Sequence, residues 1–236
     1  MIWLGIDTAN TPLSVAIVKD GELLAEENSS IAINHSLRAM TAIEEIFTKV
    51  GMVPSDIDAI AVSEGPGSYT GVRIGVTIAK TLAWTLGKPL FGVSSLKAIA
   101  TNGLIYNGFI CPIVDARRGN VYSGLYQFNN RESLSVIEDG HYGMEQLLDL
   151  LHEQGGPILF IGIDTKMHEA TIVDRLGKDA IFAPLHYNLP RASSLIYAAQ
   201  KSSKSVNVHQ FVPEYRRIAE AEANWLKEQR KEQSRD

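Results

Sequence analysis

The apolar residues near the start of the chain form short runs, which is the pattern of β-strands. The runs Ile2–Ile6 and Leu13–Lys19 lead into the turn signal Asp20-Gly21, and Glu22–Ser30 runs back from that turn. Three strands joined by such tight connections predict an antiparallel meander.

Apolar residues then recur at helical spacing between Asn34, a candidate N-cap, and Gly51, which ends the helix. Beyond it the pattern predicts, in order, a strand at Ile57–Ser63, a helix at Gly71–Leu86, a strand at Leu90–Val93 and a helix from Ser94 or Ser95 to Thr101. This order predicts a mixed sheet, because the later strands need helical crossovers.

The pattern starts again after Gly103–Gly108. Strands come first and helices later, with predicted elements at Phe109–Val114, Val121–Phe128, Leu134–Glu138, Met144–His152, Ile158–Ile163, Lys166–Leu176 and Ala192–Gln200. The repeated order predicts two related α/β lobes, at residues 1–105 and 106–212, and a charged helix at 213–230 that packs back on the first lobe.

The composition and net charge of the chain argue against several classes of function. The 236 residues carry a net charge of −5, which does not suit a protein that grips nucleic-acid phosphates by itself. A single cysteine, Cys111, excludes an internal disulfide framework and suits a reducing cytoplasm. The longest mostly apolar stretch, Val72 to Leu86, contains Arg73 and Lys80, so we expect no membrane span.

Several catalytic motifs are missing from the sequence. There is no G-x-x-x-x-G-K-[ST] phosphate loop and no G-x-S-x-G nucleophile elbow. No two of the six histidines lie three to five residues apart, and Ala39 stands four residues after His35, where a second metal ligand would be needed. We therefore expect no metal site and no catalytic residue.

Two segments are candidates for phosphate binding. Asp7 and Thr8 follow the first strand, where a carboxylate and turn N–H groups can hold a magnesium water shell and a phosphate, or simply form the turn. The glycine-rich segment Ser63–Arg73 joins a buried strand to a helix, so it is either a structural turn or an anion site. Its candidate ligand-binding residues are Gly65, Gly67, Ser68 and Thr70.

The helix predicted at Gly71–Leu86 is apolar on nearly every side, with its small residues spaced by four. Either it is buried within its own lobe, or its outer side docks another chain. The residues assigned to a partner interface are Leu37, Met40, Gly71, Val72, Gly75, Val76, Ala79, Lys80 and Ala83. On this hypothesis, Ala79→Glu or Gly75→Leu abolishes complex formation while the chain stays folded.

A third motif, Asp115-Ala116-Arg117-Arg118, lies at a turn between two strands. It is either a structural corner held by charge, or it brings Arg117 into a cleft between the lobes.

Four blocks together resemble the TsaB family, also called YeaZ. They are I-D-T at Ile6–Thr8, G-P-G-S-Y-T-G-V-R-I-G at Gly65–Gly75, D-A-R-R-x-x-V-Y at Asp115–Tyr122 and P-E-Y-R-R at 213–217. The resemblance covers essentially the whole chain and implies the actin-like ATPase fold (ASKHA, ribonuclease H-like), with two related lobes and mixed sheets.

The resemblance also implies a function. Members of the family act as non-catalytic paralogues of TsaD, the subunit that transfers a threonylcarbamoyl group to the adenosine next to the anticodon of tRNA. The implied partners are a TsaD-type catalytic subunit and a TsaE-type ATPase, with tRNA contacted only indirectly. A homodimer through the same surface is a further arrangement. No cofactor is required, although ATP or ADP at the partner interface is an open alternative.

Two other function classes remain as alternatives. One is an ATP-dependent kinase or ATPase that uses Asp7 and the glycine-rich segment, and the other is a peptidase. The sequence offers no second carboxylate motif for the first and no nucleophile–base pair for the second.

Overall fold

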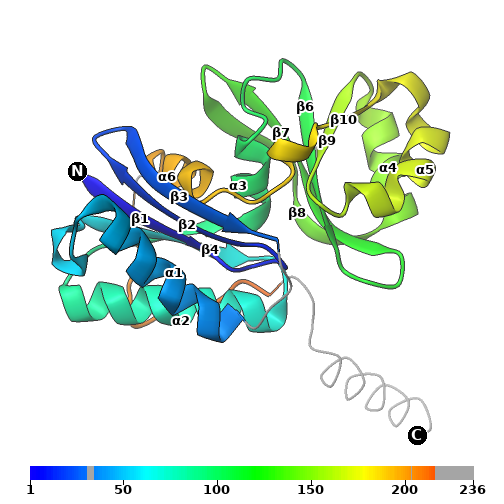
Figure 1. Ribbon diagram of the computed structural model, residues 1–236. Helices are drawn as coiled ribbons and strands as arrows, with labels where there is room; N and C mark the ends of the chain where they lie inside the picture. Colours follow the sequence, from blue (N-terminus) through cyan, green and yellow to red (C-terminus); the bar gives the residue numbers. More distant parts are fainter. Residues whose placement is uncertain (31–34, 203, 216–236) are drawn as a thin grey trace, which may run out of the picture.

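The computed structural model describes residues 1–30, 35–202 and 204–215, without the side chains of residues 35–37, and is built on two five-stranded mixed sheets (Figure 1). The strands of the first sheet are β1 (Ile2–Asp7), β2 (Leu13–Lys19), β3 (Glu22–Ser29), β4 (Ala59–Gly65) and β5 (Leu90–Ser94), in the order β3-β2-β1-β4-β5. The first three strands form the predicted antiparallel meander, and β4 and β5 add to it in parallel.

The second sheet repeats this plan. Its strands are β6 (Phe109–Asp115), β7 (Asn120–Asn129), β8 (Glu132–Gly143), β9 (Ile158–Ile161) and β10 (Ala180–Phe182), in the order β8-β7-β6-β9-β10. Here too the first three strands are antiparallel and the last two are parallel. The internal duplication is therefore confirmed, and the fold is the two-lobed actin-like arrangement that the resemblance implied.

Helices fill both sides of each sheet. The helices α1 (His35–Val50) and α2 (Tyr69–Leu86) pack on one face of the first sheet, while α4 (Met144–Gln154) and α5 (Thr165–Leu176) pack on one face of the second. The remaining two, α3 (Ser95–Thr101) and α6 (Ala192–Gln200), lie between the sheets and contact each other (Figure 1). Within the described part of the chain, no helix is both long enough and apolar enough to cross a membrane.

The two inner helices correct the predicted lobe boundary. The predicted second lobe, at 106–212, includes α6, but this helix packs on the first sheet with Trp3 and Ala61. Conversely, Leu96 and Ile99 of α3 pack on strands of the second sheet. Each half of the chain thus gives its last helix to the middle layer, because a sheet with two apolar faces needs cover on both.

The ends of the predicted elements also differ. The strand β10 was not predicted, because three residues are too short to show a period, and neither were the short 3-10 turns Pro54–Asp56, Gly177–Asp179 and Leu185–Tyr187. Residues 213–215 belong to no helix, and the rest of the predicted helix at 213–230 lies outside the described residues. The candidate cap Asn34 lies outside them as well.

A buried carboxylate joins the two halves of the chain. The Glu26 side chain, on β3, is 6% exposed. Its carboxylate accepts hydrogen bonds from the backbone N–H and the hydroxyl of Ser193, in the first turn of α6. It also pairs with Arg191, at 3.2 Å. Glu26 therefore does for α6 what an N-cap residue would do.

We expect Glu26→Ala to lower the free energy of unfolding by about 1–3 kcal/mol, because it leaves the donors of Ser193 and Arg191 without their acceptor. Urea denaturation at neutral pH measures this. The matched control is Glu27→Ala, since Glu27 makes only a long pair with Lys49, at 3.5 Å. Equal effects of the two substitutions would contradict the capping role of Glu26.

Candidate functional site

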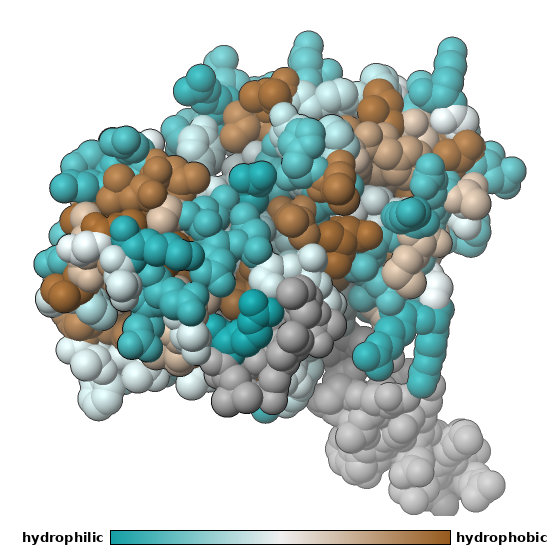
Figure 2. Space-filling model, in the orientation of Figure 1, coloured by the Kyte–Doolittle hydropathy of each residue, from teal (hydrophilic) through white to brown (hydrophobic). Residues whose placement is uncertain are grey.

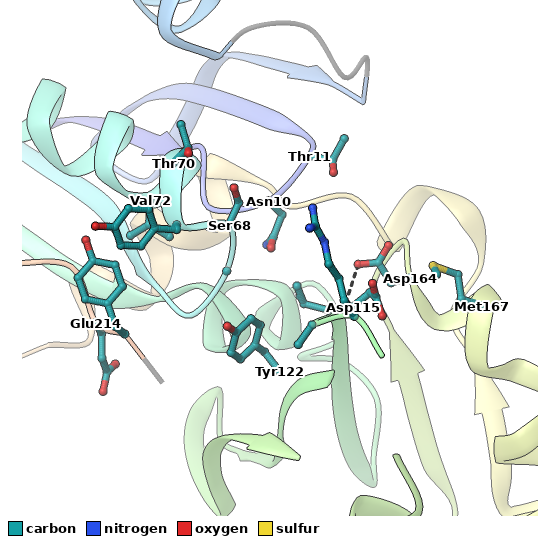
Figure 3. Close-up of a pocket in the computed structure, with 16 residues that line it drawn as sticks. Asn10, Thr11, Ser68, Thr70, Val72, Asp115, Tyr122, Asp164, Met167 and Glu214 are labelled. Atoms are coloured by element: carbon teal, nitrogen blue, oxygen red, sulfur yellow. Dashed lines mark hydrogen bonds between the residues drawn. The ribbon is translucent and has the colours of Figure 1, made fainter. Parts of the chain in front are cut away.

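A cavity of about 670 Å³ lies between the two lobes. Figure 3 shows Asn10 and Ser68 on one side of it and Asp115, Tyr122 and Asp164 on the other. The walls come from the β1–β2 loop, the first turn of α2, the β6–β7 turn, the start of α5 and the last described residues. We call this cavity the interlobe cleft.

The glycine-rich segment supplies one wall of the cleft. The Ser68 side chain caps α2 by accepting a hydrogen bond from the Gly71 N–H. Of the predicted ligand-binding residues, Gly67, Ser68 and Thr70 line the cleft, and Gly65 does not. Gly65 lies instead under the backbone of Glu214, where a side chain would not fit.

The glycines of this segment have a packing role. A Cβ atom on Gly67 would overlap the carbonyl oxygen of Ala9, and one on Gly71 would overlap that of Thr8. A Cβ on Gly75 would overlap the Thr8 hydroxyl. The start of α2 therefore rests directly on the β1–β2 loop, with backbone against backbone.

The other two predicted phosphate-binding residues are buried. Asp7 is fully buried, and Thr8 is 1% exposed. The Thr8 hydroxyl donates to the Gly71 carbonyl at 2.7 Å, and neither side chain lines the cleft. The prediction that Asp7 and Thr8 face a ligand is therefore wrong for this structure, because both side chains are enclosed by the chain itself.

Burial also changes the ionisation of Asp7. It raises the pKa of this carboxyl to about 6, against the opposing effect of a hydrogen bond from the Ala9 N–H. The ionised form of Asp7 is thus disfavoured in the folded chain.

The opposite wall of the cleft carries carboxylates. The Asp164 carboxylate, at the start of α5, accepts a hydrogen bond from the Asp115 N–H at 2.9 Å, and His168 lies 3.6 Å from the Asp115 carboxylate. Burial, and to a smaller degree repulsion from Asp115, raise the pKa of Asp164. Among the described residues, no group of three or more His, Cys, Asp or Glu side chains could hold a metal ion.

The Asp115–Arg118 motif fits both of the readings left open by the sequence. It is a corner, since Arg117 and Arg118 both adopt the left-handed backbone conformation, with φ of 67° and 57°. It also brings Arg117 into the wall of the interlobe cleft. Sequence reasoning missed Asn10, Asp164 and Met167, which carry no motif and come together only through the fold.

The last described residues form a strap over the first lobe. Val206 pairs with Leu90 of β5, and Lys80 of α2 donates to the carbonyls of His209 and Phe211. The strap ends at Tyr215, whose hydroxyl accepts a hydrogen bond from Arg73 at 2.7 Å.

The predicted partner interface needs a correction. Most of its α2 residues point into the chain's own core and not outward: Gly71, Val72, Gly75, Val76, Ala79 and Ala83. Lys80 is bound to the strap, and the side chain of Leu37 lies outside the described residues. Only Met40, which is 48% exposed, is on the surface. Gly75→Leu and Ala79→Glu would therefore disturb folding and cannot test docking.

The outward side of α1 and α2 is nevertheless apolar. Trp84 is 68% exposed, and a groove of about 420 Å³ runs beside Met40, Phe47, Met52 and Leu82. Figure 2 shows brown, apolar residues at the left end of the first lobe, interspersed with teal, hydrophilic ones. We use the name α1–α2 face for this groove together with the exposed Trp84 of α2.

We expect Gly71→Ala to lower the free energy of unfolding by about 1–3 kcal/mol, because the added methyl group meets a backbone oxygen that cannot move aside. Chemical denaturation measures this. Thr81→Ala, on the exposed side of the same helix, is the control and should stay within about 0.5 kcal/mol of the parent. A neutral Gly71→Ala would show that α2 does not press on the β1–β2 loop.

The buried Asp7 predicts a pH dependence. Its pKa is higher in the folded chain than in the unfolded one, so its contribution to stability is fully present below about pH 4 and is lost as the pH rises through about 6. Asp7→Asn cannot ionise. Relative to the parent, this variant should therefore gain about 3 kcal/mol of unfolding free energy between pH 4 and pH 7. A difference that does not change with pH would contradict the burial of Asp7.

The chain matches known proteins over nearly its full length. A family model described as TsaD, tRNA N6-adenosine threonylcarbamoyltransferase, matches residues 23–225. The Bacillus subtilis (strain 168) protein named tRNA threonylcarbamoyladenosine biosynthesis protein TsaB is 44% identical over 230 residues, which cover 98% of this chain and 100% of that protein.

Solved structures give the same result. A structure described as YeaZ from Pseudomonas aeruginosa is 26% identical with a TM-score of 0.76, covering 91% of this chain and 99% of that one. Another, described as an uncharacterized protein with similarity to peptidase YEAZ from Pseudomonas aeruginosa, is 27% identical with a TM-score of 0.78 and covers 92% and 99% of the two chains. From the extent of these matches, the chain belongs to the TsaB (YeaZ) family, within the wider TsaD-type family.

Proposed function

We propose that this chain acts in the biosynthesis of threonylcarbamoyladenosine in tRNA, as a non-catalytic subunit that docks on a TsaD-type catalytic subunit. Family membership supports the biosynthetic role, because the matched Bacillus subtilis protein is named for it. The match to the TsaD-type family model supports the pairing of two related chains.

The observation that carries the docking part is the α1–α2 face. Large exposed apolar side chains and an apolar groove on one pair of helices are typical of a docking surface. Met40, on α1, and Trp84, on α2, are both exposed, and Leu82 lies in the groove beside Met40. A groove between two adjacent helices suits the packing of a helix from a partner.

Two features support a role without catalysis by this chain. Ala39, which stands four residues after His35 where a second metal ligand would be needed, is fully buried in the core of the first lobe. Asp7, the carboxylate that an ATP-dependent enzyme would need, is fully buried and does not line the interlobe cleft. These features favour the subunit over the kinase or ATPase alternative, and the described residues offer no specific support for a peptidase.

The wider assembly belongs to the same proposal. A TsaE-type ATPase joins the complex, tRNA is held by the partner and not by this acidic chain, and the site of action is the cytoplasm. The chain requires no cofactor of its own, so that ATP or ADP, if needed, is bound where the partners meet. As an activator, the chain must bind the competent state of its partner more tightly than the inactive state.

Charged substitutions on the α1–α2 face test the proposal. We expect Met40→Glu and Trp84→Glu to weaken the complex with the TsaD-type subunit at least tenfold, because each places a charge in an apolar contact. Both side chains are exposed, so the isolated chain should keep its parent stability. Analytical ultracentrifugation measures the complex, and circular dichroism checks folding. The matched control is Leu185→Glu, an 84% exposed apolar position on the other lobe.

The same variants separate docking from function in a modification assay. The TsaD-type and TsaE-type subunits, threonylcarbamoyl-adenylate and tRNA are combined with and without the chain, and modified adenosine is measured. Loss of modification with Trp84→Glu but not with Leu185→Glu is the expected result. Full modification without the chain would refute the biosynthetic role. Full complex formation by both Met40→Glu and Trp84→Glu would show that the docking surface lies elsewhere.

A further inference from the structure

The interlobe cleft has two walls of opposite character. The wall on the first lobe offers hydrogen-bond donors, and the wall on the second lobe offers the carboxylates of Asp115 and Asp164. Neither the sealed Asp7 nor the α1–α2 face takes part in this cavity. The cleft is therefore a separate feature that the proposed function leaves unused.

One donor of the first wall lacks an acceptor among the described residues. The amide nitrogen of the Asn10 side chain has no hydrogen-bond partner among the described residues, although Asn10 is only 6% exposed. Figure 3 shows this side chain beside Ser68, directed into the space between the lobes. A buried donor of this kind is unfavourable unless an acceptor from outside the chain reaches it.

The start of α2 adds to the same wall. The N–H groups of Tyr69 and Thr70 belong to the first turn of an 18-residue helix, where no carbonyl of the helix itself can accept them, and both residues line the cleft. The positive end of the helix dipole points the same way. Arg117 adds a guanidinium to the lining, from the β6–β7 turn. Together these groups favour a carboxylate or another small oxyanion.

The charge balance of the cleft excludes a simple polyanion. Among the described residues that line it, Asp115, Asp164 and Glu214 are acidic, and Arg117 is basic. A nucleoside polyphosphate would bring several more negative charges close to these carboxylates, and the described residues offer no three-ligand metal group to neutralise them. A ligand that carries one negative and one positive group meets a complementary wall on each side.

We propose that the interlobe cleft binds a small zwitterion of the α-amino-acid type. Its carboxylate lies against the Asn10 amide and the first turn of α2, and its ammonium group faces Asp115 and Asp164. The volume of about 670 Å³ leaves room for a side chain toward the rim of the cleft, where Tyr69, Tyr122 and Tyr215 supply aromatic surface.

The test begins with the full chain and the twenty common α-amino acids, screened by ligand-observed NMR. Calorimetry then compares the tightest binder with its analogue lacking the ammonium group and its analogue lacking the carboxylate. We expect the intact amino acid to bind at least tenfold more tightly than either analogue. Inorganic phosphate and ATP, with and without Mg²⁺, complete the set of probes.

Variants locate the site. Asn10→Ala and Arg117→Gln should each weaken binding of the amino acid about tenfold, and Asp115→Asn should remove the preference for an ammonium group. The matched control is Arg131→Gln, because Arg131 is also an exposed arginine with a left-handed backbone, at φ 66°, but it lies outside the cleft. Circular dichroism and thermal unfolding confirm that each variant is folded.

Three results would overturn the proposal. Equal binding of the analogue without an ammonium group would make the cleft a plain anion site. Tighter binding of ATP than of any amino acid would make it a nucleotide site. If none of the twenty amino acids binds to the folded parent chain, the donors of Asn10 and α2 do not form an amino-acid site.

Discussion

The contact between the start of α2 and the β1–β2 loop is the constraint on which the rest of the first lobe depends. Gly67 and Gly71 allow the backbone of α2 to meet the carbonyls of Ala9 and Thr8, at a distance that no side chain would permit. This contact buries Thr8 and fixes one wall of the interlobe cleft. It also determines which side of α2 faces outward, because the small residues must face the loop.

Much of the fold was predictable because its signals are local. The hairpin turn at Asp20-Gly21, the buried strands and the helix start at Ser68 all depend on residues close together in the chain. The packing of α3 on the second sheet and of α6 on the first sheet was not predictable in this way. Both helices are buried between two sheets, so their apolar patterns do not say which sheet each one covers.

The candidate site was harder to predict than the fold, for two physical reasons. A helix that is apolar on nearly every side gives no sign of which side is inward, so the small face of α2 was assigned to a partner although the core already uses it. In a sequence, a glycine-rich turn before a helix indicates an anion site. The pattern is the same whether a ligand or neighbouring backbone fills the space beside the turn. At Gly71 the filling group is the Thr8 carbonyl, which only the tertiary structure reveals.

The position of α2 connects the cleft with the α1–α2 face. Its first turn forms a wall of the cleft, while Trp84 near its far end belongs to the exposed face. Between them the helix is held on one side by the β1–β2 loop and on another by the strap through Lys80. A helix packed this closely moves as a unit, because a local shift of one turn would open voids along its length. Whatever alters the first turn of α2 therefore acts on the α1–α2 face, which is the docking surface that we propose, because both belong to one rigid element.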